Sequence, residues 1–437
     1  MEQSFEAASP GGVAGPVRAT VAALSANLVG IGLARFGYTP LIPALIAAHW
    51  FTPAASVSLG AANLFGYLLG ALGARALASR AGLKASLRAM MALTAASFFA
   101  CAWPLGFLWF FVWRVLSGMT GGGLMALAAP AVLPHIPPSR RGLAGGAIFT
   151  GVGLGIAASG TLVPLLVKAG LVETWLGLGL LALLMTMLAW NGWPPAPRDH
   201  RSRGDSNGEA RRAVPPAGHS PDQVRGLKAR RGLKAHPHEG AFPAHAPPAT
   251  GRVLRALYLE YALNAVGLVP HMIFYVDFIA RGLGRGLAVG ARYWVLFGLG
   301  ALVGPLLAGH LGDRIGFRAA LRLAFIVETL AVALPLASVA TPALAVSSFV
   351  VGAFVPGIVA VVIGRMRELV PRDPPGQRAA WSLCTTAFAL GQALAAYGFA
   401  ALYAKSANGY PLLFALAAAS LLTALAVDLG AGRRVDR

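Results

Sequence analysis

The sequence predicts an all-α membrane protein in which twelve transmembrane helices form two bundles of six. Hydrophobic residues make up 57% of the chain and charged residues only 12%, whereas soluble domains carry about 25% charge. Apolar runs of the length that a spanning helix needs, about 20 residues, recur along the whole chain. One polar stretch, from Pro194 to Thr250, divides these runs into two equal sets.

Each expected helix is an apolar run bounded by polar or turn-forming residues. Six runs precede the polar stretch, at 18–46, 54–78, 85–103, 105–133, 142–167 and 171–193. Six follow it, at 252–280, 288–310, 319–339, 343–366, 377–404 and 409–430. The chain therefore divides into two bundles, 18–193 and 251–430, a tether at 194–250, and tails at 1–17 and 431–437. Because residues 1–16 are small and slightly acidic, we expect no cleaved signal peptide.

The tether is rich in arginine, lysine and proline, and it contains a direct repeat of Arg-Gly-Leu-Lys-Ala at residues 225–229 and 231–235. Such a composition cannot bury enough apolar surface to offset the entropy of ordering, so we expect disorder. Its histidines lack any regular ligand spacing, and we expect neither a metal site nor a cofactor.

The charge distribution predicts the orientation in the membrane. Although the net charge is +20, basic residues gather in alternate connectors between apolar runs, as they do in cytoplasmic loops, so we expect no nucleic-acid partner. The second, fourth, eighth and tenth connectors, the tether and the C-terminal tail are the basic ones. We therefore expect a multi-pass protein of the bacterial inner membrane, with the tether and both termini in the cytoplasm.

Similar turns occur at similar places in the two halves. Ser79-Arg80-Ala81-Gly82 follows the second run, and Asp313-Arg314-Ile315-Gly316 follows the eighth. Two prolines and an arginine likewise follow the fourth run (137–141) and the tenth (374–378). These matches indicate a duplicated six-helix unit, and parallel repeats around a central binding site are one plan of transporters.

Two arginines fall inside predicted helices of the first half. A charge at the bilayer centre costs about 2.5–3.5 kcal/mol on insertion scales, so each requires a partner. Arg35 lies midway along the first helix and Arg114 about 15 Å from the outer end of the fourth. No acidic residue occurs between Glu6 and Glu173. Helix carbonyls, a carboxylate of the other half or an anionic substrate could each satisfy them. For Arg114 we favour a structural role, holding its helix to its neighbours.

The seventh run of the chain, which is the first of the second half, carries a polar stripe. Glu260, Asn264, Gly267 and His271 follow the helical spacing i, i+4, i+7, i+11. Glu260 is the candidate for a proton-binding carboxylate that couples transport, and its alternative is a fixed ion pair with one of the first-half arginines. His271 is a weaker candidate, because a lone histidine is often a hydrogen-bonded core residue. Asp277 is expected to anchor a loop by pairing with the nearby arginine at 281, and Glu328 receives no role.

Other polar and aromatic side chains share these helix faces. Tyr38 lies on the face of Arg35, Asn63 and Tyr67 lie together on the second helix, and Gln392 lies on the eleventh. Because aromatic stripes usually reflect packing, we treat them as supporting contacts. The expected substrate-binding residues are Arg35, Tyr38, Asn63, Tyr67, Arg114, Asn264, His271 and Gln392.

The segment from Gly309 to Arg318 resembles the G-x-L-x-D-R-x-G-x-R loop signature of the major facilitator superfamily. The first-half copy is degraded, with Arg75 and Ser79 in place of the glycine and the aspartate. The resemblance implies a gating loop made of Gly309, Gly312, Asp313, Arg314, Gly316 and Arg318. We expect Asp313 to lie at a neighbouring helix N-terminus or to pair with an arginine.

Two further segments carry the resemblance. Arg114-Val-Leu-Ser-Gly118 resembles the R-x-x-x-G segment of the superfamily. The first helix, Gly30-Ile-Gly-Leu-Ala-Arg-Phe-Gly-Tyr-Thr-Pro40, with Asn63 and Tyr67, is similar to the bacterial YbfB/YjiJ family. This resemblance implies the major facilitator fold and an inner-membrane transporter.

Together these features predict a secondary transporter that works by alternating access and is coupled to protons. The favoured cargo is a small organic anion or an amphiphilic metabolite, and we expect a monomer whose partners are that solute and the bilayer. A receptor or sensor on the same fold and an uncoupled facilitator are the alternatives. The chain lacks a nucleotide-binding P-loop and the catalytic cluster that a membrane enzyme needs, so we expect no enzymatic activity.

Overall fold

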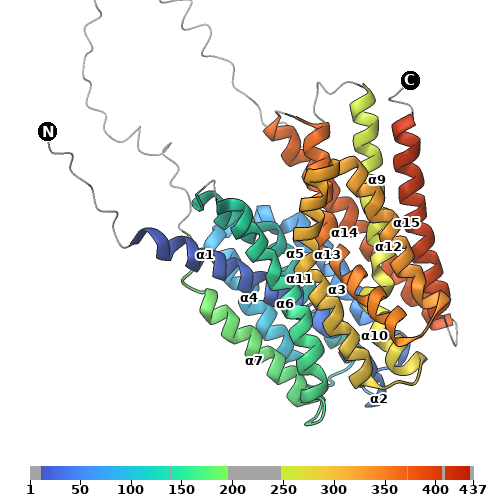
Figure 1. Ribbon diagram of the computed structural model, residues 1–437. Coiled ribbons are helices and arrows are strands. Elements are labelled where there is room, and N and C mark those ends of the chain that lie inside the picture. Colours follow the sequence, from blue (N-terminus) through green and yellow to red (C-terminus); the bar gives the residue numbers. More distant parts are fainter. Residues whose placement is uncertain (1–10, 138–139, 195–247, 372, 406–408, 434–437) are drawn as a thin grey trace, which may run out of the picture. The chain divides into compact units, whose positions relative to one another are not determined.

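The computed structural model describes residues 11–137, 140–194, 248–371, 373–405 and 409–433. These residues form one compact unit that contains both predicted bundles (Figure 1). Residues 195–247 of the tether predicted at 194–250 lie outside the described part of the chain, whereas residues 248–250, which we expected in the tether, already belong to a helix.

The first bundle contains six helical segments, of which the first is broken. The breaks give that segment four pieces: α1 (Gly11–Asn27), the π-helix η1 (Leu28–Leu33), the 3₁₀ turn η2 (Phe36–Tyr38) and α2 (Leu41–Ala47). The others are α3 (Pro53–Ala81), α4 (Leu83–Ala100), α5 (Phe107–Val132) with the short η3 (Leu133–His135), α6 (Arg141–Leu166) and α7 (Leu171–Ala189).

The second bundle repeats this plan. Its first segment consists of α9 (Pro248–Val269), the π-helix η6 (Pro270–Phe274), α10 (Tyr275–Asp277) and the π-helix η7 (Phe278–Gly282). The others are α11 (Leu287–Ile315), α12 (Phe317–Ala337), α13 (Thr341–Leu369), α14 (Pro374–Lys405) and α15 (Tyr410–Arg433).

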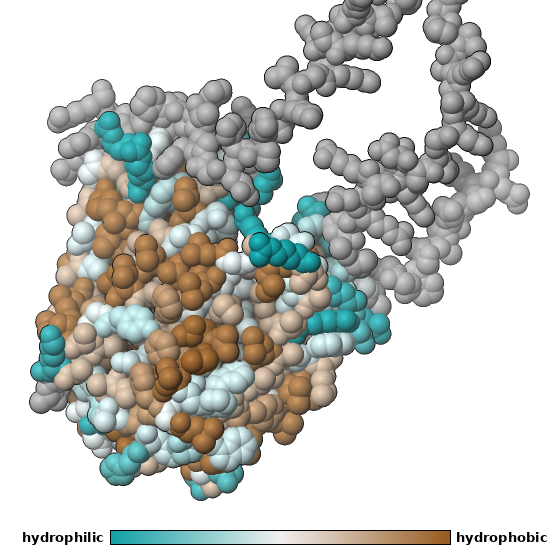
Figure 2. All heavy atoms as spheres, turned by 180° about the vertical axis from the view of Figure 1, so that it is seen from behind, coloured by the Kyte–Doolittle hydropathy of each residue, from teal (hydrophilic) through white to brown (hydrophobic). Residues whose placement is uncertain are grey.

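Each of the twelve expected apolar runs therefore corresponds to one helical segment, and the predicted fold class is confirmed. Eleven of the described segments are long and apolar enough to cross a membrane. The remaining one, α4, carries Lys84 and Arg88 in its first two turns. Figure 2 shows apolar side chains across most of one face of the molecule. Large exposed side chains such as Leu108, Leu306 and Leu394 are typical of a surface that contacts lipid.

Packing contacts within the two bundles repeat at the same sequence spacing. A side-chain carbon on Gly118 would lie 1.9 Å from the carbonyl oxygen of Asn63, and one on Gly352 would lie 2.1 Å from that of Phe297. In both bundles glycine thus lets the second and fourth helices touch through their backbones. The following turns also match, because Gly82 and Gly316 have φ values of 83° and 82°. These shared contacts agree with a duplicated unit.

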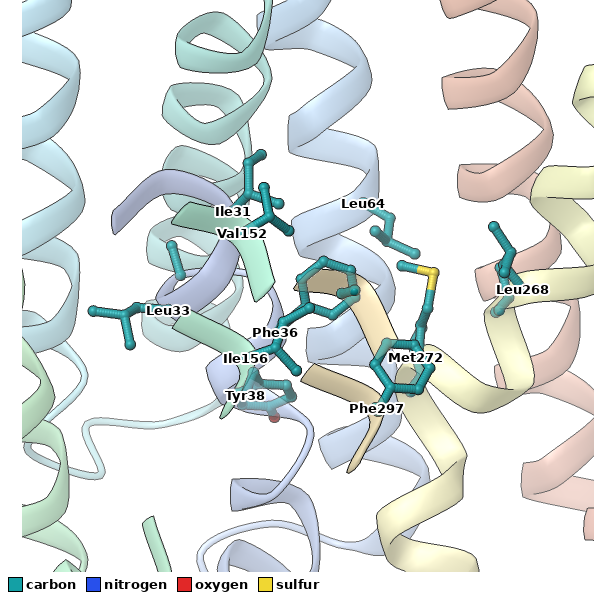
Figure 3. Packing of buried hydrophobic residues seen from close by; sticks show 14 of the residues in the cluster. Ile31, Leu33, Phe36, Tyr38, Leu64, Val152, Ile156, Leu268, Met272 and Phe297 are labelled. Atoms are coloured by element: carbon teal, nitrogen blue, oxygen red, sulfur yellow. The ribbon is translucent and has the colours of Figure 1, made fainter. Parts of the chain in front are cut away.

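The two bundles meet along two pairs of helices, α3 with α14 and α6 with α11. On α11, Gly298 packs so closely on α6 that a side-chain carbon there would lie 2.5 Å from the backbone nitrogen of Ala157. Aromatic rings fill the middle of the junction: the ring of Phe36 lies 6.1 Å from that of Trp294 and 6.2 Å from that of Phe297. Figure 3 shows Phe36 and Phe297. The broken first segments of both bundles face this junction.

Candidate substrate site between the bundles

A small cavity lies where the broken segments of the two bundles face each other. Its volume is about 10 Å³, room for about one water molecule. Figure 3 shows Phe36 near the centre of this region, with Tyr38 below it and Leu64 and Met272 to its right. The lining residues are Arg35, Phe36, Tyr38, Thr39, Ile42, Gly60, Asn63, Leu64, Met272 and Ile273.

Arg35 brings a positive charge to this cavity. It follows η1, and its guanidinium Nη2 donates to Oε1 of Gln392 and approaches Sδ of Met272 at 3.8 Å. The guanidinium carbon lies 4.9 Å from the ring centre of Tyr67 and 5.2 Å from that of Phe36, distances that allow cation–π attraction. Nε has no hydrogen-bond partner. All the described partners of Arg35 are electrically neutral.

Met272 joins the two bundles at this point, and sequence reasoning missed it. Its sulfur accepts a hydrogen bond from Nε2 of Gln392 at 3.3 Å, and its carbonyl accepts one from the Thr39 hydroxyl. Pro270 two residues earlier cannot donate an amide hydrogen, which agrees with the π-helical distortion of η6. Met272 is an apolar residue on a hydrophobic helix, so the sequence carried no signal for its contact with Arg35.

Arg114 has a different environment inside the first bundle. Its side chain is buried, Nη1 donates to the carbonyl of Ala34 at 2.8 Å, and Nε donates to that of Leu59 at 3.4 Å. Its guanidinium carbon lies 4.1 Å from the ring centre of Tyr38. Ala34 lies in the break between η1 and η2, where its carbonyl is free to accept this bond. The sequence left open a carbonyl, a carboxylate or a substrate as the partner of Arg114. Backbone carbonyls accept hydrogen bonds from two of its three guanidinium nitrogens, and Nη2 has no partner.

The remaining first-bundle candidates form the wall beside these arginines. The Tyr38 hydroxyl donates to the Ser56 carbonyl at 2.9 Å, and Nδ2 of Asn63 donates to the Arg114 carbonyl at 3.3 Å. Oδ1 of Asn63 has no hydrogen-bond partner. Tyr67 lies against Arg35, as described above. The structure thus brings together Arg35, Tyr38, Asn63, Tyr67, Arg114 and Gln392.

The polar stripe on α9 lies elsewhere. Asn264 donates to Glu328 of α12 at 2.5 Å, and Nε2 of His271 lies 2.8 Å from the Ser347 hydroxyl of α13. The ring of His271 also stacks on Tyr275 at 4.5 Å. The stripe therefore points into the C-terminal bundle, whereas we expected it to line the cavity with Arg35. Helical periodicity shows that residues share a face, but not which neighbouring helix that face meets.

Glu260 belongs to a charged group at the end of the C-terminal bundle where α9 begins. Its side chain is 3% exposed, and the charged groups near it are Asp428, Arg365 and Arg322. Arg322 forms an ion pair with Asp428. Among the described residues, the ion pairs do not include one between Glu260 and Arg35 or Arg114. The expected anchor at Asp277 is confirmed, because its Oδ1 lies 3.1 Å from Nε of Arg281.

The loop after α11 differs from expectation in one contact. Glu368 of α13, rather than Asp313, lies at the start of α12: its Oε1 accepts from the backbone nitrogen of Phe317 at 3.0 Å, and its Oε2 pairs with Arg365 at 2.9 Å. Asp313 is exposed, and no described contact joins it to that helix start. Glu368 is distant in sequence from the loop, so the motif could not indicate it.

The other motif residues surround this contact. Gly316 provides the turn with its positive φ, and a side-chain carbon on Gly312 would lie 2.3 Å from the ring of Phe317. Gly309 has open space around it. Arg314 lies in the last turn of α11, and Arg318 lies in the first turn of α12. The loop thus holds the ends of α11, α12 and α13 together.

Two helical bundles, with broken helices facing a small cavity between them, define a multi-pass membrane transporter of the major facilitator type, whose substrate is a small molecule. The chain belongs to the family described as uncharacterised MFS-type transporter YbfB, which matches residues 27–217 and 228–429. The family and fold point to a transporter without enzymatic activity.

Two relatives from Mycobacterium tuberculosis share a short region with the chain. The uncharacterized MFS-type transporters Rv2994 (strain H37Rv) and MT3072 (strain CDC 1551) are each 39% identical to it over 79 residues. The match spans only 18% of this chain and 18% of each relative.

Solved structures share the fold over nearly the whole chain. A D-xylose–proton symporter superposes with a TM-score of 0.71 at 16% identity, covering 94% of this chain and 97% of its own. The partially occluded, inward-open xylose transporter XylE from E. coli gives 0.66 at 18% identity, with the same coverage. The nucleoside transporter NupG gives 0.67 at 11% identity, covering 95% and 99%. At these identities the likeness concerns the fold alone.

Proposed function

We propose that this protein is a secondary transporter that moves a small organic solute across the bacterial inner membrane by alternating access. The favoured cargo carries an anionic group on an apolar or amphiphilic skeleton. One observation carries this proposal: Arg35 places a guanidinium in the cavity between the bundles, and its described partners there are neutral.

The surroundings of Arg35 support such a cargo. A guanidinium can bind a carboxylate or phosphate through two parallel hydrogen bonds, and Nε of Arg35 has no partner. Phe36, Ile42 and Leu64 offer apolar contacts to the rest of a solute. The cavity holds about one water molecule, so the two bundles must part before a solute can enter, as alternating access requires.

The proposal also covers the orientation of the protein in the membrane, its coupling to protons and its oligomeric state. Basic connectors support a cytoplasmic location for both termini and the tether, and we propose a monomer. Glu260 remains our candidate for the coupling carboxylate, acting from the charged group formed by Asp428, Arg322 and Arg365. The D-xylose–proton symporter shares the fold, but at 16% identity it does not indicate the solute carried here.

Arg35→Gln tests the proposed cargo. Because hydrogen bonds to charged groups contribute about 1.5–3 kcal/mol, the change should weaken binding of an anionic substrate by roughly ten- to a hundredfold. The measurement is a thermal-shift screen of organic acids, followed by uptake of the best compound into proteoliposomes. Arg88→Gln is the matched control, since Arg88 is half-buried on α4, away from the cavity, and donates to the Trp190 carbonyl.

Two results would contradict parts of the proposal. If the screen selects only cations, or if Arg35→Gln binds and transports the substrate as the wild type does, the anion preference is wrong. If the wild type binds a compound tightly but moves none of it, the protein is a receptor on the transporter fold.

A further inference from the structure

The interior of the C-terminal bundle contains a polar pair away from the substrate cavity. Glu328 lies in the middle of α12 and Asn264 lies on α9, and both side chains are completely buried. Nδ2 of Asn264 donates to Oε2 of Glu328 at 2.5 Å. Neither residue lines the cavity that holds Arg35.

The other oxygen of each side chain has no partner. Oε1 of Glu328 and Oδ1 of Asn264 are buried without a hydrogen bond, although most buried polar atoms in proteins have one. An ionised carboxylate and an amide oxygen are both acceptors, so they cannot bond to each other. A proton on Oε1 would turn it into a donor to Oδ1. One proton therefore satisfies both atoms and closes a two-bond ring between acid and amide.

The charge of an ionised Glu328 would also be unbalanced. The described ion pairs join Arg281 to Asp277, Arg322 to Asp428 and Arg365 to Glu368. Helices α9, α11, α13 and α15 pack against α12. The titratable or charged groups around this interior are Glu260, His271, Tyr275, Tyr293, Arg322, Arg365 and Asp428. Asn264 is the hydrogen-bond partner that Glu328 has in the described part of the chain. An unpaired charge in such a place is expensive, which favours the neutral acid.

We propose that Glu328 and Asn264 form a proton-binding site in the C-terminal bundle. The Glu328 carboxylate takes one proton from water to become the neutral acid, and returns it on release. Glu260 lies one helical turn before Asn264 on the same face of α9, next to the Arg322–Asp428 pair. Because the Arg322 side chain is 31% exposed, this end of the bundle gives the proton an entrance.

Helix α9 connects the proton site with the substrate site. It continues from Asn264 directly into η6, whose Met272 contacts Gln392 and Arg35 at the cavity. Loss of the proton leaves two facing acceptors that repel each other, and α9 must move to separate them. The same movement shifts Met272. This coupling step rests on the proposed function, whereas proton binding by the pair does not.

Infrared spectroscopy of the full chain in lipid nanodiscs tests proton binding directly. The wild type should show a protonated-carboxyl band at neutral pH that disappears on alkaline titration. Glu328→Gln should lose the component of this band that comes from the acid bonded to Asn264, while Glu260→Gln should keep that component. Asn264→Leu should shift the band, because the acid loses its amide partner. A band unchanged in Glu328→Gln, or unshifted in Asn264→Leu, would overturn the site.

Transport assays then test coupling. In Glu328→Gln, the amide keeps a two-bond ring with Asn264 but cannot release a proton, so substrate exchange should persist while accumulation driven by a proton gradient is lost. Gradient-driven accumulation equal to that of the wild type would refute coupling through Glu328. If the wild type moves no solute at all, the proposed function fails, and the infrared result still decides the proton site. If Glu328→Gln does not fold, the shift in Asn264→Leu decides it.

Discussion

Arg35 and Arg114 gave the same signal in the sequence, yet they have different surroundings. Each is a lone cation in a helix of a half that has no carboxylate for over a hundred residues. The structure places Arg35 at the junction of the bundles, and it places Arg114 against the carbonyls of Ala34 and Leu59. The spacing of residues on one helix cannot distinguish these two cases, because the acceptors of Arg114 are backbone atoms of other helices.

Arg114→Met should therefore destabilise the fold. The methionine keeps much of the apolar stem but leaves the Ala34 and Leu59 carbonyls without these donors, at a cost of about 1–3 kcal/mol for a buried unsatisfied group. Thermal unfolding in detergent, followed by circular dichroism, should show a lower midpoint than in the wild type. Arg35→Met is the matched comparison and should change the midpoint less, since its partners are side chains. Equal midpoints for Arg114→Met and the wild type would contradict the structural role.

At the scale of the element, the first and seventh helical segments determine the site. Each contains a π-helical piece, η1 or η6, and a polar contact joins the halves next to these pieces. Gly30 and Gly32 lie in η1 and Pro270 begins η6, and such residues favour irregular helix. Periodicity also found the stripe of Glu260, Asn264 and His271. It could not show that α12 and α13, rather than the cavity, face this stripe, because that depends on how the bundle packs.

The hydrogen bond from Thr39 to the Met272 carbonyl should stabilise the state described here. It crosses the junction close to α2 and α10, which contact each other, so separating the bundles at that end must break it. A neutral hydrogen bond contributes about 0.5–1.5 kcal/mol, so Thr39→Val should shift the population toward opening at that end by about two- to tenfold. Spin labels at the exposed Ala48 and Ala288 would report the distance between the bundles.

Thr385→Val is the control for this measurement. The Thr385 hydroxyl donates to carbonyls of its own helix, at Trp381 and Ser382, so its loss should leave the distance distribution unchanged. A distribution in Thr39→Val that matches the wild type would show that this bond does not hold the bundles together.

For the whole molecule, apolar run length was enough to predict the twelve helical segments. Because a bilayer demands that each span satisfy its own backbone, run length and charge bias carry most of the topological information. The runs at 18–46 and 171–193, for example, appear as segments at 11–47 and 171–189. The contacts that define the site join residues far apart in the chain, such as Arg35 with Gln392 and Thr39 with Met272, and local patterns do not encode such pairs.

The same packing predicts how the molecule behaves when its two halves are no longer connected. The described interface consists of α3 against α14 and α6 against α11, with contacts as close as that of Gly298 on Ala157. None of these helices belongs to the tether at 194–250. A covalent connection should therefore be needed to bring the halves together during folding, and not to keep them together afterwards.

A protease site inserted between Arg211 and Ala235 tests whether the folded halves stay together without the tether. It also tests on which side of the membrane the tether lies. In inside-out vesicles the protease should cut the tether, and in right-side-out vesicles it should not, because the basic composition places this segment in the cytoplasm. After cutting, the two halves should copurify through a tag on one of them and retain substrate flux. A version of the chain without the inserted site controls for cutting elsewhere. Cutting from the opposite side would reverse the orientation, and loss of flux from halves that still copurify would show that the tether regulates transport.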